Sequence, residues 1–307
     1  MTDFFPASRD EILNWDGEDA EFLFKLNSHG IFPAPLENAE DFRQRLLKEY
    51  AYVQKISDEA VKKNSKIILW QTSNGSDKIE VRSDAVIDRE LFEPAFEITR
   101  NLYDFAIDYV PGFYLFEKVG LLWGGCSIYD DETEMKVFLL RPAFKNKKRF
   151  LIYDRTELIA HELCHCARQV IHDHDIEEYF AYQTSRSLLR KYIGNCFTKE
   201  FDALLFLLPA LLLPIAQTVK SFVWAPLPLL PFWIFLAGVL GFFLFRNQKC
   251  RNTINKARKN LQKISGNPEA VLFRSTLGEL KKLNVSFDEY FNSLSPMRKK
   301  IIGKYLK

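Results

Sequence analysis

The sequence predicts a mainly helical α+β fold with a small antiparallel sheet and an inserted transmembrane helical hairpin. Three observations support this prediction. Apolar residues recur at helical spacing within residues 1–115. Short apolar runs punctuated by glycines, which are typical of strands, occupy residues 113–153. Residues 203–245 then contain a single charged side chain, that of Lys220.

The overall composition excludes some classes of protein. A length of 307 residues suffices for one good-sized domain or two small ones. The formal net charge of +2 is too balanced for a nucleic-acid-binding protein, so we expect no nucleic-acid partner. Five scattered cysteines do not form the pattern of a disulfide framework and indicate a reducing compartment. Residues 1–19 are acidic and lack a basic segment followed by an apolar run, so we expect no cleavable signal peptide.

Two amphipathic helices are predicted in the N-terminal part. Apolar residues recur at helical spacing from Ala39 to Lys55 and again from Leu91 to Ile107. Pro33, Pro35 and Pro111 mark breaks around them. We interpret both as core helices that bury one apolar face.

The next part of the sequence predicts short strands followed by a helix. Met135 to Leu140 and Arg149 to Tyr153 are predicted strands, and the polar stretch Tyr129 to Glu134 is a candidate turn between strands. Asp154 is suited to cap a helix running from about Arg155 to Val170, with Glu157 at the capping-box position.

This predicted helix contains the strongest chemical signal in the chain, the sequence HELCH. His161 and His165 are four residues apart, so they lie on one face of a helix and can reach one metal ion. Glu162 follows the first histidine directly and can contact a water molecule on the metal instead of the metal itself. Two neutral nitrogen ligands and an adjacent base suit metal-assisted hydrolysis.

A third protein ligand must come from elsewhere, because a catalytic zinc ion usually has three protein ligands and one open position. Glu177 and Glu178 follow on what we expect to be a second helix, after a turn that contains His172, Asp173, His174 and Asp175. The residues alone leave both carboxylates open as the third ligand.

Residues 150–190 resemble the gluzincin branch of zinc peptidases, in which a glutamate on a following helix completes the site. In many such proteins this glutamate precedes a small residue by three positions, as Glu178 precedes Ala181. The resemblance therefore implies a zincin-like catalytic core with Zn²⁺ held by His161, His165 and Glu178, and Glu162 as catalytic base. Gluzincins often carry an aspartate four residues after the ligand, where this chain has Tyr182. The metzincin pattern fits less well, because its third histidine falls on Ile171.

Other residues near the motif have weaker claims to a role. Arg168, His172, His174 and Tyr182 are candidates to stabilise an oxyanion, although an ordinary surface or core role is the simpler interpretation of each. Cys164 and Cys166 are expected to be small packing residues, with a structural zinc site as the alternative. We expect an extended substrate to pair with the strand predicted from Arg149 to Tyr153.

The apolar segment after the motif predicts two membrane spans. Ala203 to Val219 and Ser221 to Phe245 are uncharged runs, and about 20 helical residues cross a bilayer. A turn is expected near Lys220 to Pro228. Two prolines in the first run leave a re-entrant hairpin as an alternative, and a buried core hairpin is a second one. Basic residues flank both ends of the hairpin, so the positive-inside rule places both flanks in the cytoplasm.

The residues after the hairpin are basic and have a sequence pattern typical of helices. A helix is expected to begin at Asn267 and end near Leu283, and another begins after Ser286, a candidate cap. We expect this segment to fold back on the N-terminal part, with a partner-binding tail as the alternative. The predicted organisation is a zincin-like metallopeptidase domain (1–200), a transmembrane hairpin (201–246) and a basic helical C-terminal segment (247–307).

Together these features predict an integral membrane zinc peptidase whose catalytic domain faces the cytoplasm. Its expected partners are a protein or peptide substrate and membrane lipid, and the sequence leaves the oligomeric state open. A membrane-anchored zinc-binding scaffold without peptidase activity is the main alternative. A chance HExxH sequence in a membrane protein is another.

Overall fold

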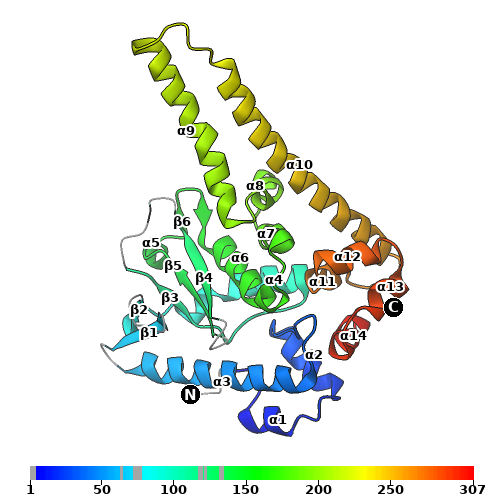
Figure 1. Cartoon of the computed structure of the whole chain (residues 1–307). Coiled ribbons are helices and arrows are strands. Elements are labelled where there is room, and N and C mark those ends of the chain that lie inside the picture. The colour runs from blue at the N-terminus through cyan, green and yellow to red at the C-terminus, as the bar shows by residue number, and fades with distance from the viewer. Residues whose placement is uncertain (1–4, 63–64, 72–77, 117–119, 121–122, 131–134) are drawn as a thin grey trace.

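The protein combines a helical body, small β-sheets and a long pair of helices that projects from the body (Figure 1). The computed structural model describes residues 5–62, 65–71, 78–116, 120, 123–130 and 135–307. Most of the predicted turn from Tyr129 to Glu134, namely residues 131–134, lies outside these described residues.

The N-terminal part is helical, as predicted. It contains α1 (Arg9–Asn14), α2 (Ala20–Ser28), α3 (Ala39–Val61), η1 (Ser83–Ala85), η2 (Arg89–Leu91) and α4 (Glu93–Tyr103). The helix predicted from Ala39 is confirmed and continues to Val61. The helix predicted to reach Ile107 instead ends at Tyr103, because Asp104 adopts a left-handed conformation with φ 59°. Arg274 donates to the carbonyl of Tyr103 at 2.7 Å and so satisfies one of the last carbonyls of α4.

The described strands form three small sheets. They are β1 (Lys66–Gln71) with β2 (Lys78–Arg82); β3 (Gly112–Tyr114), β4 (Gly125–Asp130) and β5 (Met135–Leu140); and β6 (Arg149–Phe150) with β7 (Tyr153–Asp154). In the three-stranded sheet the order is β3-β5-β4, with β4 antiparallel and β3 parallel to β5. The predicted strand from Met135 to Leu140 is confirmed. The single strand predicted from Arg149 to Tyr153 is wrong, because Leu151 has φ 49° and turns the chain between β6 and β7.

A run of short helices follows the sheets. It comprises α5 (Ala143–Asn146), which precedes β6, then α6 (Arg155–Arg168), η3 (Gln169–Ile171), α7 (His174–Tyr182), α8 (Leu188–Ile193) and η4 (Gly194–Cys196). The motif helix is therefore confirmed, and the Asp154 carboxylate caps it by accepting from the Thr156 amide at 3.0 Å. The expected capping box is wrong. Glu157 instead accepts from the Ser185 hydroxyl at 2.8 Å and the Arg186 amide at 3.1 Å, so it ties the start of α6 to the chain after α7.

The long pair consists of α9 (Glu200–Phe222) and α10 (Leu230–Leu261). Both are long and apolar enough to cross a membrane. Only 22% and 17% of their most apolar windows are buried, whereas the core helix of a soluble protein would be mostly buried. The turn between them falls where it was predicted, and Lys220 donates to the carbonyl of Leu227 there at 3.0 Å.

The C-terminal residues pack back onto the N-terminal helices. They form α11 (Pro268–Phe273), α12 (Leu277–Leu283), α13 (Phe287–Asn292) and α14 (Pro296–Gly303). The single helix predicted to end near Leu283 is interrupted, because Thr276 starts α12 with a capping box to Glu279. The Ser286 cap is confirmed by its bond from the Glu289 amide at 3.1 Å.

One hydrophobic core joins the N- and C-terminal parts. Buried residues from α2, α4, α6 and α7 share it with residues from the second half of α10 and from α11 to α14. At its centre the rings of Tyr103 and Phe273 stack with centroids 4.1 Å apart. Arg274, buried beside them, donates to the Asn27 side chain at 2.6 Å. The metal-binding candidates on α6 and α7 therefore lie on a rigid support.

Candidate metal centre

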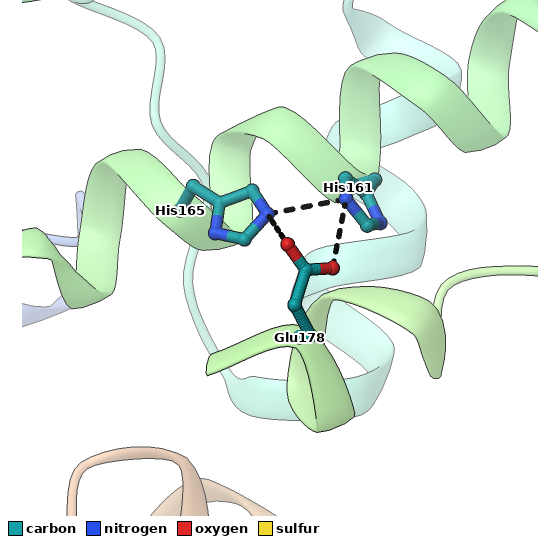
Figure 2. Close-up of side chains that lie close together, drawn as sticks. All are labelled: His161, His165 and Glu178. Atoms are coloured by element: carbon teal, nitrogen blue, oxygen red, sulfur yellow. Dashed lines mark hydrogen bonds and ion pairs between the residues drawn. The ribbon is translucent and has the colours of Figure 1, made fainter. Parts of the chain in front are cut away.

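Helix α6 presents His161 and His165 toward α7. Most other side chains of α6 are buried, including those on either side of the two histidines, whose own side chains remain 14% exposed. On α7, Ile176, Phe180 and Ala181 are completely buried, and α7 packs against α6. Figure 2 shows the result: the Glu178 carboxylate points from α7 at both imidazole rings.

The three side chains come close enough together to surround one metal ion. The Nε2 atoms of the two histidines are 3.1 Å apart. Glu178 Oε2 lies 3.7 Å from His161 Nε2, and the other oxygen, Oε1, lies 3.5 Å from His165 Nε2. Zinc bonds of about 2.0–2.2 Å in a tetrahedron require ligand atoms about 3.3–3.6 Å apart. These residues therefore fit a zinc ion, and they form a group of possible ligands within 4.8 Å of one another that does not include Glu162.

Glu177 holds the other side of His165. Its Oε1 lies 3.2 Å from His165 Nδ1, which fixes the ring so that Nε2 faces Glu178. Its second oxygen lies 3.7 Å from Nδ1 of His174, a mostly exposed side chain. A carboxylate that binds the second nitrogen of a ligating histidine orients the ring and sets its tautomer. The geometry thus separates the two glutamates that the sequence left open: Glu178 faces both Nε2 atoms, whereas Glu177 faces only the far nitrogen of His165.

His161 is held differently. The Tyr182 ring packs edge-on against it, with centroids 4.7 Å apart, and the main chain of Ala181 hydrogen-bonds to its side chain. A main-chain carbonyl that accepts from Nδ1 leaves the Nε2 lone pair free for a metal. Tyr182 stands where gluzincins often carry an aspartate, so here an aromatic ring and not a carboxylate contacts His161 from that position.

Burial and mutual charge shift the pKa values of these groups. Burial, then the charges of His165 and Arg190, hold the pKa of His161 well below its usual range. Burial disfavours protonated His165, but the hydrogen bond to Glu177 and the nearby carboxylates raise its pKa to about 9. Burial raises the pKa of Glu162 to about 7. Perturbed titratable groups gathered in one cleft are typical of a functional site.

The ligand group opens into a cleft of about 410 Å³ bounded by strand β4. Gly125, Cys126 and Ser127 line one side of it, and Ser127 hydrogen-bonds to Glu162 through its side chain and its main chain. In the described sheet β4 is an edge strand. The segment Arg149 to Tyr153, with which we expected an extended substrate to pair, is not among the described residues that line the cleft.

The remaining candidates divide into two groups. His174 and Tyr182 line the cleft. Arg168 does not: it is 1% exposed, its guanidinium lies 4.6 Å from the Phe180 ring centroid, and it donates to the carbonyl of Phe273. The lining of the cleft within the described residues does not include His172.

The cysteines have a packing role. Cys164 and Cys166 are buried in the hydrophobic core, as expected, and all five cysteines are free thiols within the described residues.

Sequence reasoning missed two parts of the site. Ser127 on β4 and Thr198 just before α9 both line the cleft, but neither belongs to a recognisable motif. In the sequence, only the pair Gly124-Gly125 pointed to the start of β4. A Cβ at Gly125 would lie 2.6 Å from the carbonyl oxygen of Leu139 on β5, so the first residue of β4 must be glycine.

Comparisons with protein-family models, with curated proteins and with solved structures find no match for this chain.

Proposed function

We propose that this chain is an integral membrane zinc peptidase with its active site on the cytoplasmic side. The observation that supports the proposal most strongly is the convergence of two imidazoles and one carboxylate within 4.8 Å of one another, beside a fourth group, Glu162, that does not belong to this set. A structural zinc site normally has four protein ligands, whereas a catalytic site keeps one position open.

In the proposed mechanism His161, His165 and Glu178 hold the zinc ion. Bound there, zinc would act as a Lewis acid on a peptide carbonyl and lower the pKa of a water molecule toward neutrality. Glu162, held by Ser127, accepts the proton of the attacking water on its carboxylate and then delivers it to the leaving nitrogen. His174 and Tyr182 are the lining side chains available to stabilise the developing negative charge.

The substrate would bind as an extended strand along β4. The main-chain groups of this edge strand can pair with a peptide in the manner of β-strand addition. This pairing would place a peptide carbonyl over the cleft that holds the three ligands, because Gly125, Cys126 and Ser127 line the same cleft.

We further propose that α9 and the first half of α10 span the bilayer as a hairpin. The segment connecting them, residues 223–229, carries no charge, whereas residues 246–263 contain seven lysines and arginines and no acid. By the positive-inside rule, this asymmetry supports a hairpin with both ends in the cytoplasm. A membrane-impermeant thiol reagent should therefore label an Ala225→Cys variant from outside intact cells, and labelling only after lysis would refute the orientation.

The peptidase proposal is tested with the purified full-length protein in detergent. We expect about one zinc per chain by elemental analysis and cleavage of unfolded casein that a chelator abolishes. Glu162→Gln should keep the zinc and lose the cleavage. If Glu162→Gln cleaves at the wild-type rate, Glu162 is not the catalytic base. Bound zinc without cleavage of a broad peptide library would favour the zinc-binding scaffold.

A further inference from the structure

Exposed apolar side chains gather next to the metal cleft, outside the membrane hairpin. Leu151 and Ile152 form the tip of the β6–β7 turn and are 55% and 69% exposed. Leu188 and Leu189 begin α8 and are 82% and 66% exposed. We call these four residues the apolar patch. Large side chains with this much exposure, close together, indicate a surface that contacts another apolar phase.

The two halves of the patch are physically linked. Arg190 on α8 donates to the carbonyl of Ile152 at 3.5 Å, and its guanidinium lies 5.4 Å from the centroid of the Tyr153 ring. Arg190 also lies 3.6 Å from Glu157 at the start of the motif helix. The β6–β7 tip and α8 are thus fixed to each other and to α6.

Helix α8 is attached to α10 immediately beyond the uncharged membrane segment. The Asn247 side chain donates to the Tyr192 carbonyl at 2.6 Å, and Arg251 donates to the Lys191 carbonyl at 3.0 Å. The last residue of the uncharged run is Phe245. Because a helix rises 1.5 Å per residue, these contacts lie about 3–9 Å beyond that run. The headgroup layer on each side of a bilayer is about 5–8 Å thick, so α8 lies at headgroup depth.

The composition of α8 suits that depth. Its sequence LLRKYI combines the exposed Leu188, Leu189, Tyr192 and Ile193 with two basic residues. Apolar side chains with neighbouring lysine and arginine are typical of helices that lie in a membrane interface, where the apolar face enters the boundary between headgroups and acyl chains. Figure 1 shows α8 beside the end of α9 at which the hairpin meets the body.

The metal cleft lies directly behind this surface. The Arg190 guanidinium lies 5.8 Å from the Tyr182 ring centroid, and Tyr182 in turn packs on the ligand His161. Thr198, which lines the cleft, precedes the first residue of α9 by two positions. The cleft therefore opens at the foot of the hairpin.

We propose that the apolar patch inserts into the cytoplasmic leaflet and holds the mouth of the cleft at the membrane surface. The substrate class that fits this placement is the extended segment of a membrane protein next to its own membrane span. This inference rests on the proposed hairpin and, for the substrate, on the proposed peptidase activity.

Membrane contact is tested by electron paramagnetic resonance without any need for activity. A Cys126→Ser background removes the one cysteine that is not buried. Nitroxide labels are then placed at Ile152→Cys or Leu189→Cys in the full-length protein reconstituted in vesicles with an anionic lipid. We expect both labels to be more accessible to oxygen than to a water-soluble nickel complex, at a depth of about 5–10 Å.

Two further positions make the result interpretable. Leu36→Cys, which is 97% exposed and lies just before α3, should show the opposite, aqueous accessibility. Ile234→Cys on α10 should be deeply buried in lipid if the hairpin spans the membrane. An aqueous signal at Ile234 would refute the hairpin itself. A lipid signal at Ile234 with aqueous signals at Ile152 and Leu189 would refute only the apolar patch as a membrane contact.

Substrate class is tested with one cleavable sequence in two forms. The first is a soluble peptide, and the second is the same sequence placed within 15 residues of a single membrane span in the same vesicles. We expect the double variant Ile152→Ser/Leu189→Ser to cleave the soluble peptide at the wild-type rate and the tethered form about tenfold more slowly, whereas Leu36→Ser changes neither rate. Equal cleavage of the tethered form by the double variant and wild type would overturn the proposed substrate placement. If the wild-type protein cleaves neither form, the proposed peptidase activity is refuted. The spin-label experiment still decides whether the apolar patch contacts the membrane.

Discussion

Replacing Glu178 by glutamine should weaken zinc binding more than the same change at Glu177. The Glu178 oxygens lie 3.5–3.7 Å from the two Nε2 atoms that would share the ion, whereas Glu177 contacts only the far nitrogen of His165, at 3.2 Å. The first change removes an anionic ligand. The second leaves a glutamine oxygen that can still accept from the His165 ring.

The two effects differ in expected size. Structural zinc sites with four ligands bind with about 10–16 kcal/mol, or about 2.5–4 kcal/mol per ligand, so Glu178→Gln should raise the dissociation constant about 10²–10³-fold. Loss of a carboxylate that orients a ligating histidine typically costs about 10–100-fold in metal affinity. Glu177→Gln should fall at the lower end of that range, because the hydrogen bond is weakened and not removed.

The measurement is a competition titration between the purified protein in detergent and a chromophoric zinc chelator. Glu162→Gln is the matched control, since it changes a third carboxylate that lines the same cleft and should leave the affinity close to wild type. If Glu177→Gln loses more zinc affinity than Glu178→Gln, Glu177 is the ligand and Glu178 is the residue that orients His165. A loss for Glu162→Gln as large as that for Glu178→Gln would show that Glu162 is a ligand and not a base.

Three further predictions test the surroundings of the site. Arg168→Ala should lower the free energy of unfolding by about 2–4 kcal/mol while zinc affinity stays unchanged, because this buried side chain packs between aromatic rings away from the cleft. Gly194→Ala places a Cβ 2.1 Å from the Tyr182 ring, so it should cost about 1–3 kcal/mol of stability and disturb the packing on the first ligand. Glu49→Gln should cost about 3–5 kcal/mol at neutral pH, because it leaves buried Lys136 without its carboxylate partner. Burial opposes ionisation of Glu49, but the charges of Lys136 and a neighbouring arginine lower its pKa below 4.5. Its stabilisation is therefore complete above about pH 4.5 and is lost as the pH falls through the folded-state pKa, so unfolding curves of wild type and variant should converge in acid.

The ligand geometry could be predicted because it depends on local helical periodicity. His161 and His165 face one direction on any α-helix. Only the resemblance to gluzincins favoured Glu178 over Glu177, through its distance to Ala181. The completely buried Ala181 explains that spacing physically, because a small residue lets α7 approach α6. The orienting role of Glu177 was not predicted, since it depends on which way the His165 ring is turned.

The sequence was least informative where long-range packing or an unusual backbone decides the outcome. Arg168 lies seven residues after His161, which on an isolated helix places it on nearly the same face and made it a candidate for the site. Its side chain is buried and bonds to the carbonyl of Phe273, far along the chain, in agreement with the simpler interpretation of a core role. Leu151 adopts a left-handed conformation that is uncommon for a leucine, so nothing in the residue types of Arg149 to Tyr153 indicated a turn. Strand β4 reaches the site only because it pairs with β5.

Helix α10 joins the membrane segment to the metal centre. Its first half belongs to the apolar hairpin, whereas Ile254, Ala257 and Leu261 are completely buried in the core of the body. Arg258 donates to the hydroxyl of Tyr179 at 3.0 Å, and the Arg251 guanidinium lies 5.3 Å from the same ring. Tyr179 directly follows Glu178 on α7, so the helix that supplies the third ligand rests against the continuation of a proposed membrane span. A shortened form that retains the arrangement of His161, His165 and Glu178 must therefore keep residues 246–261 even when the apolar hairpin is removed. If α10 spans a bilayer as proposed, its depth there would fix the height of these three side chains above the membrane.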